Sequence, residues 1–561
     1  MLENLLRDHI AHWEFTPPAM SDDPSPVLHT PPSDVLQADA PPVGRLITSG
    51  SGYTRYQPYH STWDSALVGS GLMRVGVVTC NEDGLDDPLG QAFDRPLDDL
   101  MSSLPPVSQC NALVENFFTV FSPLFHILHV PSFKTMHEAF QSNPNSISLS
   151  WLALLYVILS VSVTSLDEDT PLLRDLGRRN DPTKDITVLS TRYRAAAFRC
   201  LQADGYMFRQ TLHTLQALIL MSYGISHSHG DVWSLLGMTY HMALALGCHV
   251  DPEHFGLDVL ECENRRRCWA GLMMLYTIQN ISCGNIHQLQ IATSSAVRLP
   301  TNIDDDDLAA AAASSSNLAP PADSPRPTEM TYMLFKYRLY ELCSRICDAI
   351  IGAGSRPVSP DVVAGLESDI QRERETWASR YYYYNNNDDE EHHLPAHQRL
   401  QLHILDGYSH QLTLLLHRPA FVAAPNANDN STSTSSSRKK CIEAALAELA
   451  LHATLHRDGA ALFAPYRWYG RGVASFHAFH AAVVLVAIIV AAPSEPSAST
   501  SSDSSSPSGT SSLGGDTAGS QQKQQYRELQ QAVTDAVRIF EEMAPRSRFC
   551  AKAAPALRGL L

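Results

Sequence analysis

The stretch DVWSLLGMTYHMALALG, residues 231–247, has the most regular pattern in the chain. Its apolar side chains return every three to four residues, which is the spacing of an α-helix and not the alternation of a strand. Asp231 can accept hydrogen bonds from the free amides of a helix start, and Gly247 suits the left-handed backbone that often ends a helix. The pattern predicts a helix over 231–246, with Gly237 giving a neighbouring helix room to approach and Trp233 anchored in the core.

The same spacing recurs along most of the chain on both sides of this helix. Strand-like alternation is rare, and no internal repeat of 20–50 residues stands out. The structured part is therefore predicted to be all-α, a multi-helix array. The predicted helices cover about 109–122, 132–140, 149–166, 188–202, 208–224, 231–246, 258–283, 330–352, 361–380, 396–416, 440–456, 472–492 and 524–543.

Composition separates these helical regions from polar segments. The first part of the chain, rich in Pro, Asp and Ser, is predicted to be a mostly irregular linker with one short helix. Segments rich in Ser, Pro, Ala and Thr bury too little apolar surface to offset the entropy of ordering, so they are expected to be disordered. The predicted organisation is a linker over 1–106 with a helix at 2–10, a helical domain over 107–308, a C-terminal helical region over 329–561, and disordered inserts at 309–328, 424–438 and 493–522.

Charge and cysteine content restrict the class of protein. The net charge is −18, from 41 Lys and Arg against 59 Asp and Glu, which argues against a nucleic-acid surface. The 11 cysteines are scattered without framework spacing, and the N-terminus MLENLLRDHI is no secretory signal. Two apolar runs, 151–166 and 481–492, fall short of the roughly 20 residues that a membrane span requires. We expect a protein with reduced thiols in the cytosol or nucleus, with no membrane partner.

Motifs that carry catalytic chemistry are missing from the sequence. It has no GxGxxG or GxxxxGK[ST] phosphate loop, no GxSxG elbow and no HExxH helix. The pair His227 and His229 and the cluster formed by Glu391, His392, His393 and His397 are interpreted as polar loops, since no metal-ligand set is complete. Cys343 and Cys347 are interpreted as buried small hydrophobes. We predict no enzyme and assign no catalytic, cofactor-binding or metal-binding residue.

The run Arg265–Arg267 could pair with acidic neighbours or contact phosphate. Glu261 and Glu263 precede it by about one helical turn, and the apolar stripe that begins at Trp269 follows it. We favour the structural role, because a short basic run is poor evidence of nucleic-acid contact. Trp269, like Trp233, is predicted to be a core anchor, whereas the acidic runs 304–307 and 388–391 are expected to be solvated.

Several of these segments, taken in order, resemble the fungal-specific transcription factor domain, the middle homology region of fungal zinc-cluster transcription factors. The resembling segments are LVENFFTVFSPLFHILHVPSF (113–133), TLQALILMSYG (214–224), DVWSLLGMTYHMALALGCHVD (231–251), ECENRRRCWAGLMMLYTIQNISCGN (261–285) and VRLPTNIDDDDL (297–308). The resemblance implies a helical regulatory domain of a nuclear transcription regulator, one that controls a metabolic or secondary-metabolite pathway. It also implies partners among other regulators or the transcription machinery, and leaves open a homo- or heterodimer and a small-molecule effector.

Zinc-cluster regulators carry six closely spaced cysteines ahead of this region, whereas the first cysteine here is Cys80 and no CxxC occurs. We therefore expect a chain that lacks its own DNA-binding module, through loss or through a truncated gene model, and that reaches DNA only indirectly. On this expectation the isolated chain shows no tight, sequence-specific binding in a mobility-shift assay. Two other functions remain open at this point: a corepressor or decoy partner of intact regulators, and a helical enzyme with an unrecognised site.

Overall fold

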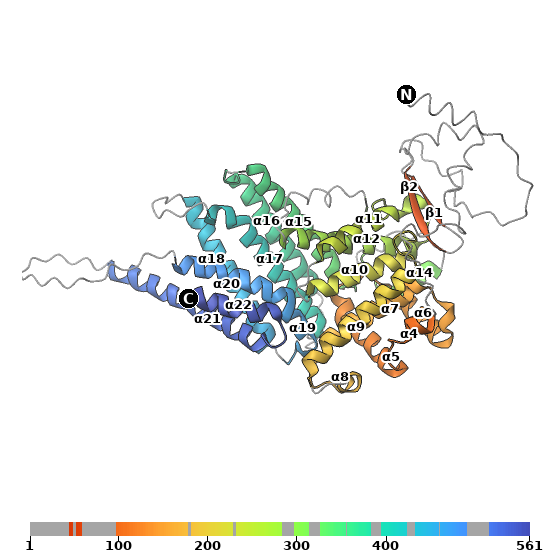
Figure 1. Cartoon of the computed structure of the whole chain (residues 1–561). Helices are drawn as coiled ribbons and strands as arrows, with labels where there is room; N and C mark the ends of the chain where they lie inside the picture. The colour runs from red at the N-terminus through yellow and green to blue at the C-terminus, as the bar shows by residue number, and fades with distance from the viewer. Residues whose placement is uncertain are drawn as a thin grey trace, which may run out of the picture.

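The computed structural model describes most of the chain from residue 97 onward and two short segments before it. The described residues are 44–48, 52–58, 97–177, 181–227, 232–282, 297–313, 326–354, 356–382, 394–422, 432–458, 461–490 and 515–560. Within these residues the protein is all-α apart from one strand pair, as predicted. Figure 1 shows the first helices and the last helices at opposite ends of the molecule, with α15–α17 between them.

The elements of the first half are β1 (Gly44–Thr48), β2 (Thr54–Pro58), α4 (Leu97–Met101), α5 (Val107–Asn116), η2 (Phe117–Phe121), η3 (Ser122–Leu124), α6 (Val130–Ser142), η4 (Pro144–Ser146), α7 (Leu149–Ser165), α8 (Pro171–Leu176), α9 (Pro182–Ala203), α10 (Leu212–His227), α11 (Trp233–Ala245), η5 (Pro252–Phe255) and α12 (Val259–Ser282). Those of the second half are α14 (Asp305–Ala313), α15 (Thr331–Ala353), α16 (Pro360–Tyr382), α17 (Ala396–Val422), α18 (Thr432–Ala453), η8 (Thr454–Asp458), η9 (Ala464–Tyr466), α19 (Arg467–Tyr469), η10 (Gly470–Ala474), α20 (Ser475–Val490), α21 (Gly515–Met543) and α22 (Arg548–Leu560).

Helix α7 forms the centre of the first apolar core. Every side chain from Ser150 to Val163 is buried, because α7 packs against α9, α10 and α5. Ser148 caps its start by accepting a hydrogen bond from the backbone amide of Trp151 at 3.3 Å. A helix that is apolar all round is stable in water only when neighbours surround it, so the prediction of a core helix at 151–166 is confirmed.

A second apolar core lies among α18, α20, α21 and α22. Helix α17 joins the two cores, since Leu412 and Leu416 belong to the first and Leu414 to the second.

In the part of the chain that the structure describes, one continuous helical stretch, Ala464–Val490, is long and apolar enough to cross a membrane by length and composition. It is longer than the predicted run of 481–492, because α19, η10 and α20 are continuous. Core helices of soluble proteins pass the same test, and α20 packs here against α18, α21 and α22.

The strand pair β1–β2 is an antiparallel hairpin that packs on the helical body near α11 (Figure 1). The Tyr53 hydroxyl donates to Oδ1 of Asp204 at 3.2 Å, and the amide of Thr54 donates to the carbonyl of Gln210 at 3.1 Å. The Tyr56 ring meets the His249 ring edge-on at 4.9 Å. This part of the predicted irregular linker is therefore ordered by contacts with residues far along the chain. The predicted helix at 2–10 lies outside the described residues.

Helix α11 corresponds to the helix predicted over 231–246, and the prediction holds better at its C-terminal end than at its start. The helix begins at Trp233 after Val232, which provides no side-chain cap, and Asp231 lies outside the described residues. Gly247 has the left-handed backbone expected of a helix end, with φ of +74°. No described neighbour lies within 4 Å of a Cβ built on Gly237, so the prediction of a close helix approach there is wrong. The close approach occurs at Gly247, where the built Cβ would lie 2.9 Å from Leu46 Cδ2.

Replacing Gly247 by alanine should therefore loosen the hairpin. A side chain at positive φ costs about 1–2 kcal/mol, and the added methyl group would also push against Leu46 and Tyr56. We expect a lower melting temperature and faster amide hydrogen exchange over 44–58. Gly237→Ala is the matched control, and should raise stability by about 0.5–1 kcal/mol because its site is helical and open. Equal exchange in the two variants would contradict the prediction.

Helices extend into each of the three segments that were expected to be disordered. Helix α14 runs through Ala313, α18 begins at Thr432, and α21 begins at Gly515. Alanine has the highest helix propensity, which explains why the run 309–313 continues a helix begun by Asp305. The remaining residues of the three segments, except 326–328, lie outside the described part of the chain.

Candidate functional site

Arg265 and Arg266 are buried near the start of α12. Their side chains form hydrogen bonds to the end of α11 and to the turn that follows it. Arg265 donates through Nε to Glu261 at 2.8 Å and through Nη1 to the carbonyl of Leu246 at 2.7 Å. Arg266 donates through Nη2 to Asp251 at 2.6 Å and to Glu253 at 2.8 Å. Both guanidinium groups are thus used within the fold.

Arg267 is fully buried and lies between two buried carboxylates. It donates through Nη1 to Oδ1 of Asp305 at 2.7 Å and through Nε to Oε1 of Glu263 at 3.3 Å. Glu263 also accepts from the backbone amide of Thr301 at 3.1 Å. The segment that contains Thr301 and Asp305, which comes after α12 in the sequence, is thereby bound to this helix by charge-assisted hydrogen bonds.

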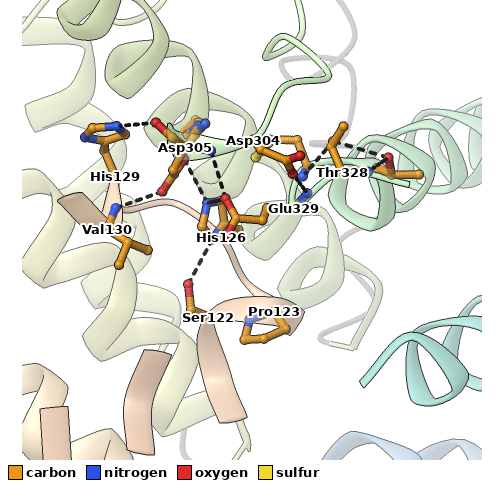
Figure 2. Close-up of polar contacts among 12 residues, drawn as sticks. Ser122, Pro123, His126, His129, Val130, Asp304, Asp305, Thr328 and Glu329 are labelled. Atoms are coloured by element: carbon orange, nitrogen blue, oxygen red, sulfur yellow. Dashed lines mark hydrogen bonds and ion pairs between the residues drawn. The ribbon is translucent and has the colours of Figure 1, made fainter. Parts of the chain in front are cut away.

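Asp305 is the centre of this polar cluster (Figure 2). Its Oδ2 accepts from the amide of Val130 at 2.8 Å, and its Oδ1 lies 3.1 Å from Nε2 of His126. Nε2 of His129 donates to the Asp305 carbonyl at 3.0 Å. Burial alone would raise the pKa of Asp305, but the adjacent His126 ring and the charge of Arg267 hold that pKa well below its usual range. Asp305 is therefore an anion inside the protein.

The starts of α14 and α15 are held together beside Asp305. The Asp305 amide donates to Oε2 of Glu329 at 2.8 Å, and the Glu329 amide donates back to Oδ1 of Asp304 at 2.9 Å (Figure 2). Arg326 adds an ion pair to Asp304 at 3.2 Å. Reciprocal bonds of this kind satisfy backbone amides that a helix start leaves free.

Three of these residues could in principle hold a metal ion. Nε2 of His126 and one carboxylate oxygen each of Asp305 and Glu329 lie within 4.8 Å of one another. An imidazole with two carboxylates is a donor set that zinc and iron accept. Here Asp305 already accepts from Arg267, and Glu329 from a backbone amide. The buried guanidinium supplies the positive charge, so we interpret the cluster as structural.

The cluster brings together three of the segments quoted from the sequence. His126 and His129 come from 113–133, Arg267 from 261–285, and Asp305 from 297–308. The predicted structural role of the arginines is confirmed, because all three are buried and paired with carboxylates. The expectation that 304–307 is solvated is wrong for Asp305, which is 2% exposed. Periodicity gave no signal for it, since its partner Arg267 lies 38 residues away.

The other candidates from the sequence lie apart from this cluster. Cys343 and Cys347 are buried on α15, as predicted. His227 ends α10 and packs edge-on against the Trp468 ring at 5.1 Å. His397 lies in α17, and burial lowers the pKa of its imidazole. His229, Glu391, His392, His393 and the run 388–391 lie outside the described residues.

Histidines with lowered pKa values should make the protein sensitive to acid. Burial lowers the pKa to about 4 for His213, His410 and His456 and to about 3 for His477. The unfolded chain, with a histidine pKa near 6.5, takes up protons as the pH falls through 6.5, whereas the folded chain does not. The free energy of unfolding therefore falls as the pH is lowered from 6.5 toward 4.

Three carboxyl groups oppose this trend. Burial raises the pKa of Glu448 to about 8 and that of Asp204 to about 6, and it also raises the pKa of Asp406, so protonation of these groups favours the folded chain as the pH falls. Because the four histidines outnumber these carboxyls, we expect the melting temperature to drop between pH 6.5 and 4.5. Scanning fluorimetry across this range checks the result, and a melting temperature that stays level or rises on acidification would contradict it.

Comparisons with known proteins agree with the order of these segments. Residues 114–380 match the fungal specific transcription factor domain. The relatives include transcription factor phm2 of Pyrenochaetopsis sp, which is 25% identical over 359 residues, 63% of this chain and 46% of the relative. The equisetin cluster transcription factor eqxF of Fusarium heterosporum is 26% identical over 286 residues, 46% of this chain and 40% of the relative. The fusarisetin A cluster transcription factor fsa6 of a Fusarium species is 30% identical over 186 residues, 31% of this chain and 24% of the relative.

No solved structure matches the chain significantly. The chain spans about half the length of the first relatives that it matches, or less. Helices α6 to α15 and the polar cluster around Asp305 fall within the matched residues. Residues 114–380 are a fungal specific transcription factor domain, and the relatives of this chain are fungal transcription factors.

Proposed function

We propose that this chain is a transcription regulator that acts in the nucleus through its helical body and controls a secondary-metabolite gene cluster. The observation that carries the proposal is the match of residues 114–380 to the fungal specific transcription factor domain. The relatives named as cluster transcription factors support the finer statement about secondary metabolism.

The fold supports a regulatory and non-enzymatic role. The buried arginines and carboxylates of the matched domain hold its helices together, as Arg267 and Asp305 do. Arg265–Arg267 is the only run of three arginines in the sequence, and its burial removes it as a phosphate-contacting surface. Under the proposal the chain works through other regulators or the transcription machinery, and its effect on a gene depends on which of these it contacts.

A tethering experiment tests the proposal. The full 561-residue chain, fused to an unrelated DNA-binding domain and a fluorescent tag, is expressed in yeast with reporters that score activation and repression. We expect nuclear fluorescence and a change of at least fivefold in one reporter relative to the DNA-binding domain alone. A folded, abundant fusion that is nuclear yet leaves both reporters unchanged would overturn the proposal.

A further inference from the structure

Lys336 is buried in α15, and no carboxylate of the described residues forms an ion pair with it. Its side chain is 3% exposed, and among the described residues it makes no ion pair and no hydrogen bond. Its Nζ atom lies 5.4 Å from the centre of the Tyr332 ring and 5.6 Å from that of Tyr408. Burial lowers the pKa of Lys336 to about 7. A buried cation without an anion is costly, and such groups are found where they serve a function.

Unpaired hydroxyl groups lie near this lysine. In the part of the chain that is described, the hydroxyls of Tyr332 and Tyr223 have no hydrogen-bond partner, although both side chains are buried. Burial raises the pKa of both phenols well above its usual value; the charge of Tyr408 adds to the rise for both, and that of Tyr223 adds to it for Tyr332. Buried polar groups are nearly always satisfied, so several unsatisfied ones around one cation require an explanation.

A buried carboxyl borders the same group of residues. Glu448 is 4% exposed, and its Oε2 has no hydrogen-bond partner within the described chain. Its Oε1 lies 4.0 Å from Nδ1 of His477, whose ring packs edge-on against Tyr408 at 5.0 Å. Since burial raises the pKa of Glu448 to about 8, the carboxyl is largely protonated near neutral pH and can donate a hydrogen bond.

We name Lys336, Tyr223, Tyr332, Tyr408 and Glu448 the lysine cluster. Its members lie on α10, α15, α17 and α18, so the cluster joins the matched domain to helices beyond residue 380. It offers one ammonium group, donors from two free phenols and one protonated carboxyl, and the faces of several aromatic rings. Every one of these features suits an anion attached to a flat apolar group, whereas a cation would be repelled by Lys336.

We propose that the lysine cluster is a binding site for a small aromatic or unsaturated carboxylic acid. The ligand carboxylate accepts from the Lys336 ammonium and from the Tyr332 hydroxyl, and its apolar body lies against the tyrosine rings. The bound anion supplies the charge partner that Lys336 lacks within the described chain. This inference concerns binding alone and does not depend on the proposed transcriptional role.

Benzoate is the probe for this site, and benzamide is its uncharged counterpart of the same shape. Purified full-length chain at pH 6.5 is equilibrated overnight with each compound, and melting temperature and calorimetric binding are measured. We expect benzoate to raise the melting temperature in a concentration-dependent way and benzamide to leave it unchanged. Lys336→Met, which keeps the length of the side chain and removes its charge, should weaken benzoate binding at least tenfold.

Two further variants make the test decisive. Tyr332→Phe removes only a hydroxyl that has no hydrogen-bond partner among the described residues, so it should fold like the wild type and bind benzoate several-fold more weakly. Lys552→Met, on the exposed face of α22, should bind like the wild type. The proposal is overturned if benzoate fails to stabilise the wild type, or if it stabilises Lys336→Met and Tyr332→Phe as much as the wild type.

Discussion

Replacing Arg267 by methionine is expected to lower the free energy of unfolding by about 3–5 kcal/mol, which is a large part of the stability of most domains. The variant removes a guanidinium group that is 0% exposed and leaves Asp305 and Glu263 as buried carboxylates with no cation between them. Such uncompensated charges cost more than the ion pair contributed, so we expect little soluble protein and an early unfolding midpoint in urea.

Arg298→Met is the matched control, because Arg298 also pairs with carboxylates, Asp251 and Glu253, but is 61% exposed. Water screens an exposed pair, so this variant should lose less than about 1 kcal/mol. Should urea denaturation give similar midpoints for Arg267→Met and Arg298→Met, the central role assigned to the Asp305 cluster would be wrong.

The second large effect is expected at Trp269. Its side chain is 5% exposed and packs against the rings of Tyr240 at 6.0 Å and His249 at 6.4 Å. Replacing it by alanine should cost about 3–5 kcal/mol through lost contacts and an unfilled cavity. Trp233, which was also expected to be a core anchor, is only half-buried and stacks on Tyr276 at 5.8 Å.

Trp233→Ala should therefore cost roughly half as much as Trp269→Ala. Thermal and urea unfolding of the two variants, followed by circular dichroism, provide the comparison. In cells, any loss of regulation should track the loss of protein. A Trp269→Ala protein with wild-type stability and abundance but failed regulation would show that the residue contacts a partner instead of supporting the core.

Long periodic helices could be predicted from the sequence, and elements that depend on distant contacts could not. The helix predicted at 149–166 is α7, and the one at 258–283 is α12, each within a residue or two. Helix α22 was missed because Pro555 lies inside it and proline argues against a helix interior. The hairpin β1–β2 was missed because its order comes from Asp204, Gln210 and Gly247, far along the chain.

The same limit applies to the polar cluster. Pairs one helical turn apart, such as Glu261 with Arg265 and Glu263 with Arg267, could be predicted from spacing alone. The pairing of Arg267 with Asp305 could not, because no local rule distinguishes one aspartate of the run 304–307 from its neighbours. The lysine cluster gave no sequence signal either, since Lys336 falls in an ordinary helical pattern and its neighbours come from four helices.

Helix α17 makes the melting of the two apolar cores interdependent. Leu412 and Leu416 lie in the first core and Leu414 in the second. Unfolding of either core would therefore expose one apolar face of α17 to water. A chain with two cores usually unfolds in separable steps. Here the shared helix adds a coupling free energy between those steps. A substitution or ligand that stabilises one core should therefore also stabilise the other.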